Sequence, residues 1–279
     1  MVQISAKQVS ELRQKTGAGM MECKKALVAC EGDLEASIDY LRKSGIAKAA
    51  KKAGRSTTQG KLVARSQGNT TVLLEMLCET DFVAKTSEFI ELSNNIADKA
   101  LSEFKVDGDI AAPLGEMVLD DIKVLISKIG ENMHLRRALR WNTNGQIGTY
   151  LHTGVPYGVM VEVEGECSPE LLNNICLHVC ASNPTYISPA DVPAEFIAKE
   201  REIAAATPEL QGKPAAMLEN ILKGKMNKIY KEICLMNQPW IDDEKTTLAA
   251  IAPAVKVKRF VRWLVGEELP GEKEDSQEE

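Results

Sequence analysis

Few residues of the chain stand in patterns that could carry covalent chemistry. The histidines His134, His152 and His178 are far apart, and none lies in a local signature with a serine or cysteine nucleophile. The segment 54–61 ends in Gly-Lys, but its glycines are one residue too far apart for a phosphate-binding loop, and Leu62 replaces the Ser or Thr that would bind magnesium. We therefore expect no enzyme activity, no catalytic residue and no cofactor.

A Cys-x-His-x-Cys pattern at 176–180 is the best candidate for a metal site. If this stretch is helical, Cys176 and Cys180 share the apolar face with Leu172, whereas His178 points elsewhere. A structural zinc ion requires a complete tetrahedral set of ligands, which this spacing does not provide. We therefore favour core packing of the cysteines and expect no bound metal.

Composition is that of a globular protein, and the charge is unevenly spread. The 279 residues are 44% hydrophobic and carry a net charge of -6. Residues 1–55 are nonetheless net basic, whereas residues 266–279 are strongly acidic. An acidic total argues against a stable complex with nucleic acid, which needs a broad basic surface. The acidic tail is expected to be solvated and without fixed structure.

The cysteines and the hydropathy pattern indicate a reducing compartment. The 7 cysteines are odd in number, form no Cys-x-x-Cys pair and lie mostly in apolar patterns, which is typical of buried, reduced thiols. No stretch approaches the ~18 consecutive apolar residues that cross a membrane, and no secretory signal pattern opens the chain. We therefore expect a cytoplasmic protein without membrane contact.

Residues 1–54 are predicted to form a three-helix domain with a basic linker. Ser5 and Gln8 make a capping-box pattern at the start of the first helix. Asp33 is a suitable N-cap for the third helix, which Gly45 is predicted to end. The basic stretch 48–55 then follows as the linker.

Residues 55–140 change to a strand-then-helix pattern and are predicted to form an α+β subdomain. The β-branched runs 60–66 and 70–78 flank Gly68-Asn69, which is a hairpin signal. Periodic apolar positions then predict two helices and a further strand, at residues 87–104, 113–129 and 132–140.

Residues 141–263 repeat this order as a second α+β subdomain. Strands are expected at 146–152 and 157–163, followed by a helix that opens with Ser168-Pro169. Two more helices, 194–206 and 214–236, would form a helical-hairpin (coiled-coil) insertion at about 188–236, and residues 264–279 are the acidic C-terminal tail. The predicted fold class is therefore α+β, with an N-terminal three-helix domain and a core of two subdomains.

Three sets of side chains admit either a structural or a binding role. Asp81-Phe82 follow the strand 70–78 at a turn into the next helix, so Phe82 either packs in its own core or is held out as a wedge for a partner. A Met20-Met21 pair beside Lys24 either packs among the helices or forms a flexible contact patch. His152, at the tip of the second hairpin, is an ordinary turn residue or a contact.

Two long motifs resemble the signatures of the bacterial elongation factor Ts family. The first is Leu12-Arg13 followed by Thr16-Gly17-Ala18-Gly19-Met20-Met21-Glu22-Cys23-Lys24-Lys25-Ala26-Leu27, and the second is Thr80-Asp81-Phe82-Val83-Ala84. Shorter stretches match in the same order at 31–35, 41–45, 128–132, 178–182 and 238–239. The resemblance therefore covers nearly the whole chain.

The resemblance implies guanine-nucleotide exchange on elongation factor Tu during translation elongation. It implies that the N-terminal domain is ubiquitin-associated-like and that Phe82 inserts between helices of the partner's GTPase domain, with Asp81 making polar contacts beside it. Magnesium coordination at the nucleotide phosphates would be disturbed, and GDP released. The implied partner contacts are Thr80, Asp81, Phe82 and Val83, a second set of Leu12, Met20, Met21 and Lys24, and His152 toward the partner's other domains.

Two functions of other classes remain open from the residues. A ribosome- or RNA-associated protein would use the basic N-terminal helices and the stretch 48–55, bind RNA in a salt-dependent way and leave nucleotide release unchanged. A small metabolic enzyme would act through a site without a recognisable signature. The sequence also leaves open whether the helical hairpin joins two copies of the chain in a homodimer.

Overall fold

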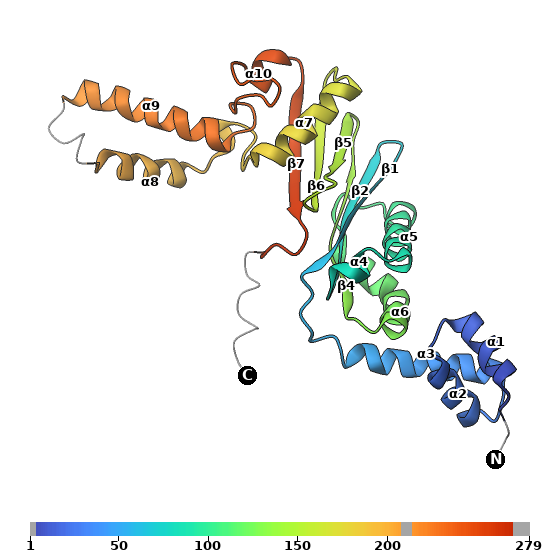
Figure 1. Cartoon of the computed structure of the whole chain (residues 1–279). Coiled ribbons are helices and arrows are strands. Elements are labelled where there is room, and N and C mark those ends of the chain that lie inside the picture. Colours follow the sequence, from blue (N-terminus) through green and yellow to red (C-terminus); the bar gives the residue numbers. More distant parts are fainter. Residues whose placement is uncertain (1–3, 208–213, 270–279) are drawn as a thin grey trace. The chain divides into compact units, whose positions relative to one another are not determined.

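The computed structural model describes residues 4–207 and 214–269, and the chain divides into two compact units (Figure 1). The first unit contains the residues up to Asn142 and the segment that begins at Leu264, and the second runs from Thr143 to Trp263. Each unit combines helices with a small β-sheet, and the first also carries the N-terminal helices. This mixture of helices and strands behind a helical N-terminus agrees with the predicted α+β class.

Three helices open the first unit, α1 (Ala6–Thr16), α2 (Met20–Ala29) and α3 (Leu34–Ala50). The predicted capping box at Ser5 and Gln8 is present, and Asp33 caps α3 by accepting a 2.9 Å hydrogen bond from the Ala36 amide. Gly17 ends α1 with a φ of 67°, the left-handed conformation that glycine tolerates. The helices close over a small core of buried side chains: Val9, Leu12, Cys23, Ala26 and Leu27.

The third helix is longer than the sequence predicts. Gly45 is predicted to end it, but α3 continues through Gly45 to Ala50, so the first residues of the expected linker 48–55 are helical. Gly45 is buried against α6 (Ala111–Ile129), where an added Cβ would lie 2.8 Å from the Ser127 Oγ. This glycine therefore permits the close approach of two helices and is not a helix stop.

The sheet of the first unit has four strands in the order β1-β2-β4-β3. β1 (Gln59–Gln67) and β2 (Thr70–Cys78) form the predicted hairpin. β2 also pairs antiparallel with β4 (Met133–Asn142), and the last pair of this ladder is Cys78 with Met133. The short strand β3 (Gly108–Asp109) pairs with the other edge of β4. The central strand β2 thus ends next to the start of β4.

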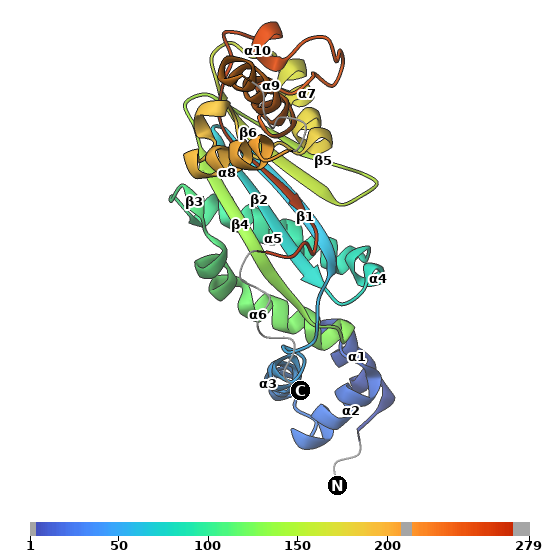
Figure 2. The same cartoon turned by 90° about the vertical axis from the view of Figure 1, so that its left-hand side faces the viewer.

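Two helices cover one face of this sheet. α5 (Ser87–Glu103) and α6 lie side by side against it, as Figures 1 and 2 show. Alternate residues of β2 point toward the helices, and Phe89 of α5 packs among them with no exposed surface. The core of this unit therefore lies between the sheet and the helix pair, and the short helix α4 (Asp81–Ala84) joins β2 to α5.

A buried carboxylate fixes the start of the C-terminal segment to the first unit. Glu75 on β2 is fully buried, and it accepts hydrogen bonds from the Gly266 amide at 2.9 Å and from Arg137 Nε at 2.6 Å. The same guanidinium pairs with Glu267 at 2.6 Å. The prediction of a solvated tail is therefore wrong for Gly266 and Glu267, because these residues satisfy a buried ion pair. Residues 270–279 lie outside the described residues.

The sheet of the second unit has three strands in the order β5-β6-β7. β5 (Gln146–Leu151) and β6 (Tyr157–Glu164) pair antiparallel, and β7 (Lys256–Leu264) neighbours β6. α7 (Pro169–Ser182) packs against the sheet and carries the predicted proline in its first turn. Gly148 permits this close packing, because a Cβ there would lie 2.7 Å from the Leu172 Cγ.

Two further helices of the second unit lie side by side, α8 (Ala194–Ala205) and α9 (Ala215–Ile233) (Figure 1). Arg201 and Glu219 form an ion pair between them at 2.9 Å. Part of the predicted connecting turn, 208–213, lies outside the described residues. The remaining elements are the 3₁₀ turn Pro189–Asp191 and the short helix α10 (Leu248–Ile251).

Two expectations about composition can be compared with the structure. All seven cysteines are free, and all except the half-buried Cys30 are buried, which confirms the prediction of buried thiols. Among the helices of the described ranges, none combines the length and the hydropathy that a membrane crossing requires.

Candidate functional site

The pentapeptide 80–84 presents one aromatic side chain to solvent. Thr80 caps the short helix α4, which takes the place of the simple turn that the sequence predicts. Phe82 is 79% exposed, more than any other large hydrophobic side chain of the described residues. Its neighbour Val83 is buried in the core of the first unit. Phe82 therefore does not pack in its own core, and Val83 anchors the helix instead of offering contact surface.

The start of α4 is held by the carboxylate of Glu131, which follows α6. Thr80 donates to both carboxylate oxygens, at 2.7 Å from its Oγ1 and at 3.0 Å from its backbone nitrogen. The same Oγ1 accepts the N-cap hydrogen bond of the Val83 amide at 3.4 Å. At the other end, Thr86 Oγ1 donates to the Val83 carbonyl at 2.8 Å. The backbone of α4 is thus fixed at both ends.

A second carboxylate, that of Glu79 at the end of β2, binds the backbone of the residue before β4. Glu79 accepts a 2.6 Å hydrogen bond from the backbone nitrogen of Asn132, and its carboxylate lies 3.4 Å from an Arg55 guanidinium nitrogen. The Asn132 side chain donates to the Arg55 carbonyl at 2.9 Å. The end of β2 and the chain before β4 therefore hold each other through two acidic side chains.

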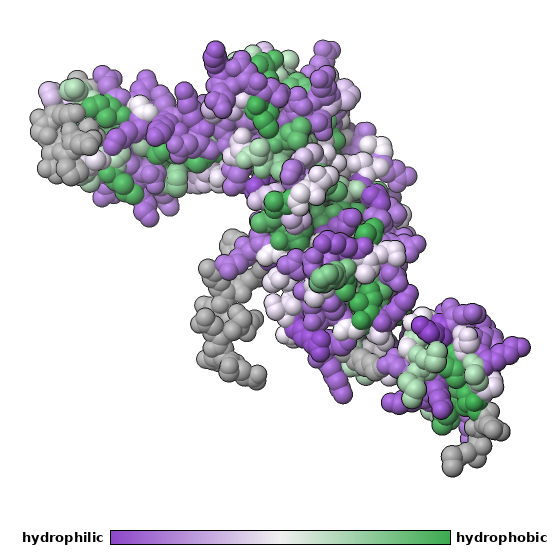
Figure 3. Space-filling view, viewed as in Figure 1, coloured by the Kyte–Doolittle hydropathy of each residue, from purple (hydrophilic) through white to green (hydrophobic). Residues whose placement is uncertain are grey.

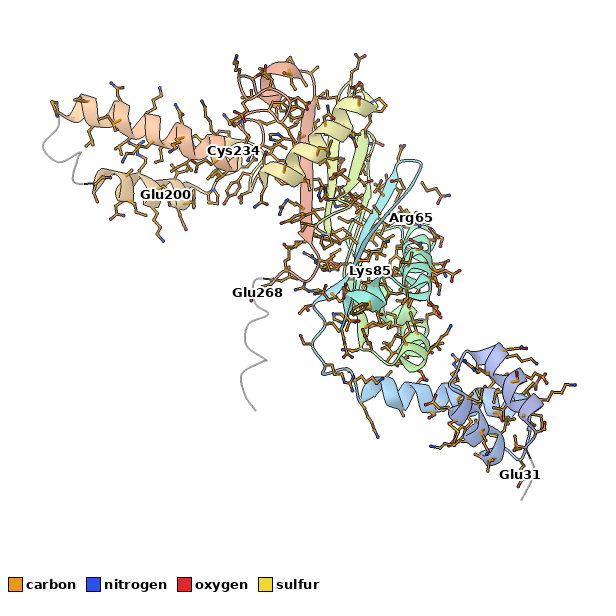
Figure 4. All side chains as sticks on the ribbon, viewed as in Figure 1. Glu31, Arg65, Lys85, Glu200, Cys234 and Glu268 are labelled. Carbon is orange, nitrogen blue, oxygen red and sulfur yellow. The ribbon has the colours of Figure 1, made fainter. Side chains whose placement is uncertain are left out.

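Asp81 forms an ion pair at the exposed surface of α4. Its carboxylate lies 2.6 Å from the Lys85 Nζ, and Lys85 is labelled beside α4 in Figure 4. The hydrogen bond from Lys85 lowers the pKa of Asp81 below its ordinary value, so Asp81 is ionised at neutral pH. The exposed surface of α4 thus carries both an aromatic ring and an ion pair.

The thiol closest to α4 is not reactive. Cys78 Sγ donates to the Thr80 carbonyl at 3.2 Å. Burial, and after it the charge of Glu131, raises the pKa of the Cys78 thiol to about 12. Because the thiolate is the reactive form, this cysteine is a structural residue.

The two cysteines and the histidine of the Cys-x-His-x-Cys pattern on α7 are all buried, so the side to which His178 points is packed as well. His178 has no exposed surface; its Nε2 lies 3.0 Å from Gln238 Oε1, and its ring stacks on Trp240 with centroids 5.0 Å apart. α7 is therefore covered on more than one side. Within the ranges that the structure describes, no group of three or more His, Cys, Asp or Glu side chains is placed to hold a metal.

Of the second predicted contact set, the structure exposes three side chains and buries the fourth. Met20 is 57% exposed and Met21 is 65% exposed at the start of α2, and Lys24 is exposed one turn later. Figure 3 shows hydrophobic residues at the surface of the N-terminal helices. Leu12, in contrast, is fully buried in the core of the three helices. Leu12 is therefore a core residue that supports the patch and has no surface to offer a partner.

His152 lies in the second unit, at the end of the β5–β6 hairpin. Its side chain is exposed, and Nδ1 is 2.8 Å from the Tyr150 hydroxyl. The structure thus leaves His152 accessible but places it in a different compact unit from α4 and α2.

The residue that sequence reasoning missed is Glu131. In the sequence it stands in the family-like stretch 128–132, and no pattern there assigns it a role. Its partner Thr80 is 51 positions away in the chain, so no helical or strand periodicity relates the two. The available signal was a carboxylate directly after Gly130, at the end of an amphipathic helix.

Comparisons with known proteins show which family this chain resembles. The model of the family described as Elongation factor TS matches residues 79–267, which include α4. Elongation factor Ts of Alcanivorax borkumensis is 43% identical over 278 residues, 96% of each chain. The proteins of the same name from Pasteurella multocida and Xanthomonas campestris are 44% and 40% identical; the matches cover 96% and 98% of this chain, and 93% and 96% of theirs. The chain therefore belongs to the elongation factor Ts family.

Proposed function

We propose that this protein is a guanine-nucleotide exchange factor that binds elongation factor Tu in the cytoplasm and promotes release of GDP. The observation that carries the proposal is the 79% exposure of Phe82 on a helix whose neighbouring residues are braced from both ends. An exposed aromatic ring that the fold holds outward is typical of a side chain that is buried in a complex. Family membership supplies the partner.

The mechanism is one of differential binding. The protein needs to bind the nucleotide-free partner more tightly than the partner with GDP, because only such a difference shifts the equilibrium. Phe82 would separate helices of the GTPase domain, and the Asp81 carboxylate would make polar contacts with the partner beside it. Movement of those helices would disturb the magnesium and phosphate site. No bond of the nucleotide is broken, so no catalytic residue is needed.

The magnitudes indicate that Phe82 does not act alone. Weakening GDP about a thousandfold requires a coupling of about 4 kcal/mol, whereas burial of one aromatic side chain provides about 2–3 kcal/mol. The exposed Met20 and Met21 are the natural source of the remainder, because their flexible apolar side chains adapt to a partner surface. Lys24 would add a charge at the edge of that contact.

The test is release of fluorescent GDP from preloaded elongation factor Tu. Adding this protein should accelerate release, and Asp81→Ala with Phe82→Ala should return the rate most of the way to the spontaneous one. Val106→Ala is the matched control, because Val106 is also an exposed hydrophobic residue, at 63%. Release that is equally fast with the double variant and with the control would refute the wedge. No acceleration with the unaltered protein, together with salt-dependent RNA binding, would favour the RNA-associated alternative.

The helical pair of the second unit offers a surface for a second copy of the chain. No residue of α8 is buried, and Ile203 and Met217 are 56% and 51% exposed. Self-association through α8 and α9 would bury these side chains. Sedimentation of the protein and of Ile203→Glu is the measurement; an unchanged monomer mass for both would exclude this contact.

A further inference from the structure

A helix as short as α4 cannot fix the direction of an exposed ring by itself. Its four residues make too few hydrogen bonds to offset the conformational entropy that is lost when one helical turn is ordered. Phe82 adds little support, because most of its surface is in solvent. The direction of Phe82 therefore depends on the residues that join α4 to the sheet.

Those residues continue the pairing of β2 with β4 after the backbone ladder stops. The last ladder pair is Cys78 with Met133. The next two positions on each strand are joined by side chains: Glu79 accepts from the Asn132 amide at 2.6 Å, and Glu131 accepts from Thr80 at 2.7 and 3.0 Å. Each carboxylate thus takes the place of a backbone carbonyl at the point where the chain turns away into α4.

Of the two carboxylates, Glu131 is the one that acts on α4. The pairing of β2 with β4 is complete without it, and Glu79 with Asn132 still ties the strand ends together. Glu131 is bonded to the hydroxyl and the amide of Thr80, and this hydroxyl is also the N-cap of α4. Loss of the carboxylate would therefore release the cap from which Asp81 and Phe82 extend and leave the sheet in place.

We propose that Glu131 is a positioning residue for nucleotide exchange: it fixes Thr80 and thereby the direction in which Phe82 is presented to the partner. The inference rests on the proposed function. A ring that is already oriented loses less conformational freedom when it is inserted, so more of the contact energy remains to displace the nucleotide. Glu131 acts through Thr80 and has no contact with the nucleotide in this scheme.

The test is a double-mutant cycle between Glu131→Ala and Phe82→Ala in the GDP-release assay. With Phe82 present, Glu131→Ala should slow the maximal release rate about tenfold, because two hydrogen bonds to a charged group are lost. The half-saturating concentration should change by less than roughly twofold. In the Phe82→Ala background the same change should have almost no further effect. Equal slowing in both backgrounds would overturn the inference, since a general loss of stability does not depend on Phe82.

Two milder variants keep the test valid if Glu131→Ala folds poorly. Thr80→Val removes the hydroxyl and should behave as Glu131→Ala does. Glu131→Gln offers one acceptor oxygen to two donors, and its release rate should fall between those of Glu131→Ala and the unaltered protein. Normal exchange by both Thr80→Val and Glu131→Gln would overturn the positioning role.

Amide hydrogen exchange separates this inference from the proposed function, because it needs no partner. The amides of Val83, Ala84 and Lys85, which bond within α4, should exchange faster in Glu131→Ala, while those of β2 should be unchanged. Unchanged protection at residues 83–85 would overturn the positioning role. If protection falls as expected but GDP release with Phe82→Ala is as fast as with the unaltered protein, the wedge function is wrong. The conclusion that Glu131 fixes α4 through Thr80 would still hold.

Discussion

Phe82 and Phe89 are seven positions apart on successive helices, and the structure gives them opposite environments. Phe82 on α4 is 79% exposed, whereas Phe89 on α5 is 0% exposed and lies in the core of the first unit. The N-terminal helices repeat the contrast, with Met21 exposed and Leu12 buried. Residues close together in the chain therefore divide into those that build the fold and those that the fold presents to solvent. Substitutions of the residues that build the fold should lower the free energy of unfolding, whereas substitutions of the presented residues should impair partner binding or nucleotide exchange.

The largest expected effect is on stability and comes from the buried member of the pair. Phe89→Ala should lower the free energy of unfolding by about 3–5 kcal/mol, because it leaves a cavity between the sheet and the helices. Phe82→Ala should change it by less than about 0.5 kcal/mol, as for other exposed positions. Chemical denaturation of the two variants measures both values. A loss for Phe82→Ala that approaches the loss for Phe89→Ala would show that Phe82 belongs to the core.

How far the sequence predicts these environments depends on whether the deciding contact is local. Capping at Ser5 and Asp33 and the hairpin after β1 are set by neighbouring residues, and these predictions are confirmed. The prediction for the end of α3 is wrong, because the role of Gly45 depends on Ser127, which is remote in the chain. A glycine that permits close packing and one that ends a helix look the same in sequence.

The residues of the candidate site also divide into those that the local sequence indicates and those whose role depends on remote contacts. The sequence located Phe82 and Met20-Met21, but composition and periodicity could not decide between core and surface for either. The resemblance alone implies that Leu12 contacts the partner, whereas the structure buries Leu12 in the core of the three helices. The clamp by Glu131 could not be predicted, because it joins residues that only the sheet brings together.

The next largest effect concerns the exposed pair on α2. Met20→Ala with Met21→Ala should weaken binding to elongation factor Tu roughly tenfold, because part of the apolar contact area is removed. Stability should remain unchanged, since both side chains are more than half exposed. Calorimetry of the complex measures the affinity. Leu12→Ala is the matched inward control, and it should reduce stability first; unchanged affinity of the methionine variant would return the pair to a structural role.

A smaller effect is expected from the buried histidine of the second unit. Burial lowers the pKa of His178, against the smaller raising effects of Gln238 and Asp242. Gln238 uses its Nε2 to donate to two carbonyl groups, so His178 Nε2 donates to Oε1. His178 Nδ1 is then a buried acceptor that no hydrogen-bond partner reaches among the described residues. A proton on this nitrogen would be buried without a partner, which is why the folded state disfavours it.

The resulting dependence on pH has a definite sign. Above the ordinary histidine pKa of 6.5, His178 is neutral in both states and its contribution to stability is complete. As the pH falls below 6.5 toward the lower folded pKa, the unfolded chain takes up a proton that the folded chain refuses, and stability declines. The slope is at most about 1.4 kcal/mol per pH unit. Denaturation curves for the natural chain and His178→Asn should differ by this slope, and equal slopes would show that His178 takes up its proton equally in the folded and unfolded states. The rate of nucleotide exchange near neutral pH should not show this dependence on pH, because His178 is neutral there.

The smallest effect is expected from Lys85, the ion-pair partner of Asp81. Lys85→Met removes the hydrogen bond that lowers the pKa of Asp81, so this pKa should rise toward its ordinary value, and a carbon-detected NMR titration measures the change. Asp81 still remains ionised at pH 7, and the exposed pair contributes little to the fold. Release of GDP should therefore slow by less than about twofold, since the carboxylate that the partner meets is unchanged. A much larger loss would mean that Lys85 itself contacts the partner, and the contact surface would then extend from Phe82 to Lys85, the residue that follows α4.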